Sequence, residues 1–75
     1  MKTIWHVDIP ATGYGVYLGF VIVSSDPYTA RDMARKKVAT CGEAEAKEFD
    51  LVATVSSIGS GEGPDRIVME SFKAG

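Results

Sequence analysis

Residues 20–34 read FVIVSSDPYTARDMA, and this stretch decides the fold because it leads a strand directly into a helix. The strand part, Val16–Ser24, is apolar on both faces, which is typical of a central strand. Asp26 can accept backbone N–H groups as an N-cap, and Pro27 suits the first helical position. The apolar residues that follow recur at helical spacing: Ala30, Met33, Ala34, Val38 and Cys41. We therefore expect a helix that begins at Pro27 and ends near Gly42, a natural C-terminal cap.

Three further strands are predicted around this unit. Thr3–Ile9 alternates at period two, Phe49–Ile58 alternates in the same way, and Arg66–Phe72 forms the last strand after a glycine-rich loop. The acidic residues 43–48 read as an extra helical turn or a loop. The predicted order is β-β-α-β-β. This is an α+β fold in which two hairpins form a four-stranded, mainly antiparallel sheet with one helix packed on one face.

Length and composition exclude several classes of protein. The 75 residues are expected to form a single domain, residues 1–75. Cys41 is the only cysteine and His6 the only histidine, so we expect no internal disulfide, no zinc site and no cofactor. The net charge of −2 argues against sequence-blind nucleic-acid binding. The short apolar runs, the lone cysteine and the lack of a signal-peptide pattern favour a cytoplasmic protein with no membrane partner.

The predicted sheet has more apolar surface than one helix can cover. Several strands are apolar on both faces, and successive residues of a strand point to opposite faces. The side chains that a single helix cannot all cover are Ile4, Tyr17, Val21, Val23, Val52, Val68 and Phe72. In the last strand, Ile67 and Met69 are predicted to share a face. A second copy of the chain or a different partner would supply the missing layer, and strand twist with long loops is the alternative cover.

Catalytic signals are weak in this sequence. His6 and Asp8 share one face of a strand, roughly 7 Å apart along it. Such a pair can orient a base, but catalysis also needs a pocket and usually a nucleophile within reach. Cys41 at the helix C-terminus is interpreted as a small buried residue, because a reactive thiolate prefers a helix N-terminus. The loop of residues 59–65 joins two strands, whereas a phosphate cradle leads into a helix. We therefore expect no enzymatic activity.

Charged and aromatic residues give the candidate contact surfaces. Arg31 and Arg35 lie one turn apart on the predicted helix and share a face, with Lys36 beside them. The alternative is a solvated helix surface on which Asp32 pairs with Lys36. An acidic segment follows, and a tyrosine flanks the first turn. The candidate partner-binding residues are Tyr14, Arg31, Arg35, Lys36, Glu43 and Glu45.

Phe20–Ala34 also carries a family resemblance. An aromatic-led β-branched strand, Phe20–Val23, is followed by a small residue with an acidic cap, Ser24–Asp26, and then by Ala-Arg-x-x-Ala at Ala30–Ala34. This pattern resembles small phage and prophage proteins, among them small type I anti-CRISPR proteins of the I-E and I-F classes. The chain departs from that pattern at Ser24, where alanine is more usual, and in lacking the tryptophan that often follows the helix.

The resemblance implies a phage-encoded, non-enzymatic inhibitor. It would bind a protein complex of the host defence machinery in the host-cell cytoplasm. It would act by steric occlusion of a surface that handles nucleic acid, so nucleic acid would be involved only indirectly. Two other functions remain open. A homodimeric structural or regulatory module would use the uncovered sheet face, and a nucleic-acid-binding module would use the basic helix with an affinity that falls steeply with salt.

Overall fold

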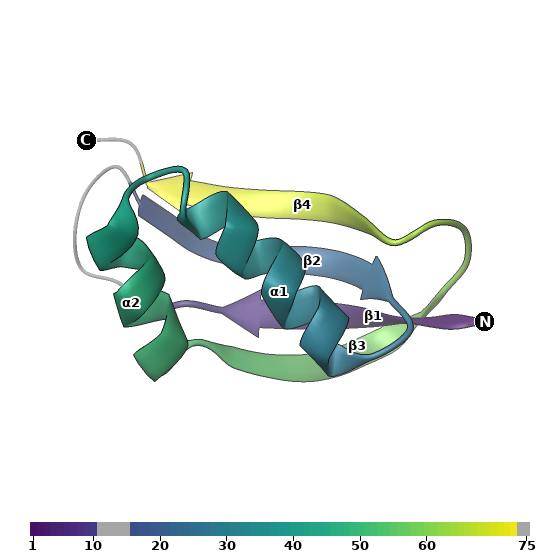
Figure 1. Ribbon diagram of the computed structural model, residues 1–75. Helices are drawn as coiled ribbons and strands as arrows, with labels where there is room; N and C mark the ends of the chain where they lie inside the picture. The colour runs from purple at the N-terminus through teal and green to yellow at the C-terminus, as the bar shows by residue number, and fades with distance from the viewer. Residues whose placement is uncertain (11–15, 74–75) are drawn as a thin grey trace.

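The computed structural model describes residues 1–10 and 16–73, apart from the side chains of residues 16, 17, 72 and 73. The described chain forms two layers, a four-stranded antiparallel sheet and a helical layer in which one helix lies across a face of the sheet and a second helix lies beside it at the end of the sheet (Figure 1). Along the chain the elements are β1 (Lys2–Asp8), β2 (Val16–Ser24), α1 (Pro27–Val38), α2 (Glu43–Val52), β3 (Thr54–Gly61) and β4 (Arg66–Lys73). The predicted α+β class with one four-stranded antiparallel sheet is confirmed. Neither described helix is long and apolar enough to cross a membrane.

The strand order in the sheet is β3-β1-β2-β4, so the first two strands are central and the last two are the edges. Every neighbouring pair is antiparallel. β1 and β2 are neighbours, as their predicted hairpin requires. The second predicted hairpin is wrong, because β3 and β4 lie at opposite edges and the short connection of residues 62–65 crosses the end of the sheet between them (Figure 1).

The start of α1 follows the sequence prediction. The Asp26 carboxylate accepts hydrogen bonds from the backbone N–H of Thr29 at 2.8 Å and from its hydroxyl at 2.9 Å, and Pro27 opens the helix. Such caps satisfy backbone donors that the first turn leaves without partners. The predicted end is wrong, because α1 stops at Val38 and Gly42 is instead the N-cap of α2. Gly42 has φ 142°, a conformation that strongly favours glycine.

The main difference from the sequence prediction is α2, which occupies residues 43–52 where a strand beginning at Phe49 was predicted. Two periodicities overlap in this segment. Apolar residues alternate from Phe49 to Val55, but Ala46, Phe49 and Ala53 also recur three and four residues apart, as on one face of a helix. The helix prevails because Ala, Glu, Lys and Leu are strong helix formers and because Ala46 and Phe49 become buried.

The hydrophobic core fills the space between the sheet and the helices. Its buried members are Val7, Ile9, Phe20, Ile22, Ala30, Ala34, Val38 and Phe49. Trp5 packs against this cluster and donates its indole N–H to the carbonyl of Ser24 at 3.2 Å. The two alanines of α1 have no side chain beyond Cβ, so the helix backbone lies close to the sheet. The alternation predicted for β1 is therefore confirmed, with Trp5 and Val7 on the core side.

The opposite environments of Phe49 and Leu51 provide a direct test of α2. Phe49 is 0% exposed and Leu51 is 85% exposed, as helical geometry requires for residues two apart. Phe49→Ala is expected to lower the free energy of unfolding by about 3–5 kcal/mol. Leu51→Ala is expected to change it by less than about 0.5 kcal/mol. Urea denaturation followed by the fluorescence of Trp5 measures both. Similar large losses for the two variants would contradict α2, because a strand would bury both side chains on one face.

Candidate functional site

The face of the sheet that points away from the helices carries the candidate site. We call it the open face, formed on the central strands by Ile4, His6, Asp8, Val21 and Val23. The pairing register places Ile4 opposite Val23 and His6 opposite Val21. Both described helices lie on the other side, so no helix covers these positions (Figure 1).

One end of the open face is covered by the chain itself. Val23 is only 2% exposed, although it belongs to this face. A Cβ added to Gly61 would lie 3.1 Å from Cγ1 of Ile4 and 3.5 Å from Cγ2 of Val23, so the end of β3 rests on these two side chains. An ion pair of 2.6 Å between Lys2 and Asp65 holds the connection that follows. Cover by the chain itself, the alternative considered from the sequence, therefore accounts for Ile4 and Val23, although a strand end supplies it rather than a long loop.

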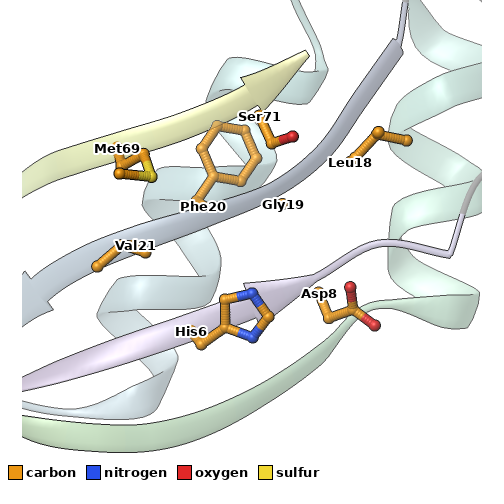
Figure 2. Close-up of a pocket in the computed structure, with 8 residues that line it drawn as sticks. All are labelled: His6, Asp8, Leu18, Gly19, Phe20, Val21, Met69 and Ser71. Atoms are coloured by element: carbon orange, nitrogen blue, oxygen red, sulfur yellow. The ribbon is translucent and has the colours of Figure 1, made fainter. Parts of the chain in front are cut away.

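The other end of the open face holds a depression of about 240 Å³ (Figure 2). Its lining residues are His6, Asp8, Leu18, Gly19, Phe20, Val21, Met69 and Ser71. Gly19 leaves the space at its centre because it has no side chain. A Cβ at Gly19 would lie 2.9 Å from the carbonyl oxygen of Val7 and 3.8 Å from Nε2 of His6. The close approach of β1 thus requires glycine at this position, and the depression follows from that packing.

β4 contributes to the depression through a β-bulge. Ile67 lies opposite Ile22 on the core side, whereas Met69 lies opposite Val21 on the open face. Val68 is the extra residue between these two pairs. The prediction that Ile67 and Met69 share a face is therefore wrong, because the bulge shifts the alternation by one residue. Met69 is 63% exposed at the rim of the depression.

His6, Asp8 and Ser71 all line the depression and are of the types found in hydrolytic triads. Ser71 lies opposite Gly19, which lies opposite Asp8, so β2 separates the serine from both residues of β1. This register sets the Cα atoms of His6 and Ser71 about 12 Å apart. No side-chain hydrogen bond joins any two of the three within the described part of the chain. A nucleophile and its base must lie within hydrogen-bond reach, so this arrangement is not an assembled triad.

The two arginines predicted to contact a partner bind α2 instead. Arg35 donates from Nε and Nη2 to the Asp50 carboxylate at 2.8 and 3.0 Å. Arg31 donates from Nη2 to the backbone carbonyl of Asp50 at 3.1 Å, and its guanidinium lies 5.1 Å from the centre of the Phe49 ring. A cation over a ring face and a two-point contact to a carboxylate are both attractive arrangements. These side chains therefore fasten α2 onto α1, and a contact with a partner remains a prediction.

The remaining candidate residues lie apart from the depression. Lys36 forms an ion pair with Asp32 at 3.2 Å, one turn away on α1. This is the pairing that the sequence predicts if this side of the helix is a solvated surface and not a contact surface. Glu43 and Glu45 occupy the first turn of α2, where negative charge interacts favourably with the helix dipole. Tyr14 lies outside the described residues.

The sequence predicted a contact surface of Tyr14 and charged residues between Arg31 and Glu45, with the uncovered sheet face as the alternative, and it did not indicate Gly19, Met69 or Ser71. The one available signal was Gly19 inside an otherwise apolar strand, a position that often marks a bulge or a close backbone approach. Cys41, expected to be buried, is half-buried in the turn between α1 and α2. Among the described residues, no group of three or more His, Cys, Asp or Glu side chains is placed to hold a metal ion.

Comparison with protein-family models, with curated proteins and with solved structures finds no match to this chain.

The contact between α1 and α2 predicts a pH dependence of stability. The hydrogen bond from Arg35 lowers the pKa of Asp50 below its ordinary value of 3.8, and the charge of Arg35 acts in the same direction. A carboxyl whose pKa is depressed by folding stabilises the fold above its ordinary pKa, and this stabilisation is lost as the pH falls through the lowered value. Asp50→Asn is therefore expected to melt at a lower temperature than the wild type near neutral pH.

Thermal unfolding at about pH 7 and at about pH 2.5 measures this effect. The difference between wild type and Asp50→Asn is expected to shrink at the lower pH, because the pH then approaches the lowered pKa of Asp50 and the stabilisation by its carboxylate is progressively lost. Asp26, whose pKa is also lowered by hydrogen bonds from Thr29, is present in both proteins and therefore cancels in the comparison. A difference that stays constant over this pH range would show that the Asp50 carboxylate does not stabilise the fold.

Proposed function

We propose that this protein acts without catalysis, by binding another protein through the open face of its sheet. The observation that carries the proposal is the position of both helices on the same side, which leaves the depression around Gly19 uncovered. Met69, 63% exposed, stands at its rim. Apolar side chains surrounded by polar ones on an exposed concave surface are typical of sites that bind proteins.

The chemistry of the depression fits one anchoring side chain of a partner. Val21 and Met69 provide apolar walls, and Asp8 provides a carboxylate that has no ion pair within the described structure. An apolar or positively charged side chain would fill the space over Gly19. The walls belong to paired strands, so little flexibility is lost on binding, and this favours affinity. Steric occlusion of a partner's surface needs nothing more than such a contact.

For the partner we propose a protein complex of the bacterial defence machinery of the type I CRISPR class, in the host cytoplasm. This part of the proposal rests on the resemblance carried by Phe20–Ala34. We place the proposed contact on the open face and not on α1, because Arg31 and Arg35 donate hydrogen bonds to Asp50 of α2. It also favours a protein over a nucleic acid, since affinity for nucleic acid needs several free cations facing the phosphates.

The experiment mixes the purified protein with type I-E and type I-F surveillance complexes and measures co-elution and binding of target DNA. Asp8→Lys and Ser71→Arg change exposed residues of the open face, and Lys36→Glu changes an exposed residue of α1 as the matched control. The wild type is expected to co-elute with one complex and to reduce its DNA binding. Both open-face variants are expected to weaken the association at least about tenfold. Lys36→Glu is expected to bind like the wild type.

Two results would contradict this proposal. Failure to co-elute with either complex would remove the proposed partner class. Loss of binding in Lys36→Glu, with unchanged binding in Asp8→Lys and Ser71→Arg, would place the contact on α1. Circular dichroism of each variant establishes that it is folded before binding is compared.

A further inference from the structure

The depression over Gly19 is framed by side chains from three neighbouring strands (Figure 2). The pairing register sets Asp8 of β1 and Ser71 of β4 on either side of Gly19. In the next row along the strands, Val21 of β2 lies beside Met69 of β4. The floor of the depression is therefore a glycine, one wall is apolar, and the two flanks are polar.

The size of this depression suits a single side chain. Its volume is about 240 Å³, whereas pockets that enclose drug-sized ligands usually measure about 300–1,000 Å³. It lies on a face of the sheet that no described helix covers (Figure 1). A side chain that projects from the surface of a partner protein can therefore enter it without rearrangement of the strands.

Asp8 gives the depression its charge. It is exposed and makes no ion pair within the described residues. No lysine or arginine is among the lining residues. Lys2, on the same strand, pairs with Asp65, and Arg66 donates to two carbonyl oxygens of the connection that precedes it. A carboxylate without a counter-charge makes this end of the open face complementary to a cation.

The other polar groups around the depression can also accept hydrogen bonds. Nε2 of His6 lies 3.8 Å from the position of a Cβ on Gly19, and the Ser71 hydroxyl lines the flank on β4. A neutral imidazole has one acceptor nitrogen, and a hydroxyl has two acceptor lone pairs. An apolar occupant would cover these groups and the Asp8 carboxylate without giving them partners, which is costly. The depression therefore fits an occupant that donates hydrogen bonds.

The two polar flanks are too far apart for one ammonium group to bond with both. Neighbouring strands lie about 4.8 Å apart, so β1 and β4 are separated by roughly 10 Å across β2. The planar guanidinium of arginine presents five N–H donors that point in different directions. One of its edges can meet the Asp8 carboxylate in a two-point contact while another N–H reaches toward Ser71. The methylene groups of the same side chain then lie against Val21 and Met69.

We propose that the depression over Gly19 is an arginine-binding subsite, filled by one arginine side chain on the surface of the partner protein. This subsite rests on the proposed function, because its occupant belongs to the partner that the open face binds. The guanidinium lies between Asp8 and Ser71, and the stem crosses Gly19 along the apolar wall. A side chain at Gly19 would occupy this space, and its Cβ would lie 2.9 Å from the carbonyl oxygen of Val7.

NMR titration of the full chain with short peptides tests the subsite. The probes are blocked tripeptides in which arginine, lysine, citrulline or norleucine stands between two glycines. Citrulline keeps the planar head and the stem of arginine without the charge, and norleucine keeps only an apolar chain. The arginine peptide is expected to bind with a millimolar dissociation constant and to shift the His6 ring, Val21 methyl and Met69 methyl signals. The methyl signal of Met33, which packs against the core, is expected to stay in place.

Each of the other three peptides is expected to bind at least about threefold more weakly than the arginine peptide. Asp8→Asn removes the charge with little change of shape, and it is expected to weaken binding of the arginine peptide by at least about threefold. The matched control is Asp32→Asn, which removes an exposed carboxylate from α1. This variant is expected to bind the arginine peptide like the wild type.

Three results would overturn the arginine-binding subsite. Binding of the lysine, citrulline or norleucine peptide as tight as that of the arginine peptide is the first, and unchanged binding of the arginine peptide to Asp8→Asn is the second. Both leave the open face as a contact surface, so the proposed function survives them. The third is the absence of shifts at His6, Val21 and Met69 with every peptide. No host complex enters the titration, so its failure is distinct from a failure to co-elute.

Discussion

The packing of α1 against one face of the sheet, with α2 packed beside it, is the constraint on which the rest of the structure depends. Ala30 and Ala34 have no exposed surface, so α1 lies directly on the central strands. Phe49 then anchors α2 beside it, and Arg31 and Arg35 tie the two helices through Asp50. No helix of the described chain covers the opposite face, and only one end of that face is covered by the end of β3. A chain of 75 residues can build one such core, and in its described part no second helical layer lies on the other face.

The open face is divided by two glycines that act in opposite ways. Gly61 lets the end of β3 rest on Ile4 and Val23, and this closes one end of the face. Gly19 lets β1 approach closely and leaves a hollow between β1 and β4 at the other end. The exposed Met69 borders this hollow. The same missing side chain that permits the strand packing thus forms the proposed binding surface.

The parts of this structure that depend on local sequence were predictable. The strand at Val16–Ser24, the Asp26 cap and the alternation along β1 each follow from neighbouring residues, and all three are confirmed. α2 was missed because alternation and helical spacing coexist in the same ten residues, and only the burial of Phe49 decides between them.

The candidate site was only half predictable for a similar reason. Alternation placed His6 and Asp8 on one face of the first strand, away from Trp5 and Val7. Met69 and Ser71 lie on the same face as His6 and Asp8 because β4 pairs with β2, a strand about fifty residues away in sequence. The bulge in β4 also sets this arrangement, and the local sequence pattern does not predict it. The exposure of the open face is tested most directly by the relaxation that a soluble paramagnetic probe causes in NMR signals from the two faces of the sheet. We expect strong relaxation of the His6 ring and Val21 methyl signals, and little relaxation of the Val7 and Ile22 methyl signals. Equal protection of both sets would contradict it.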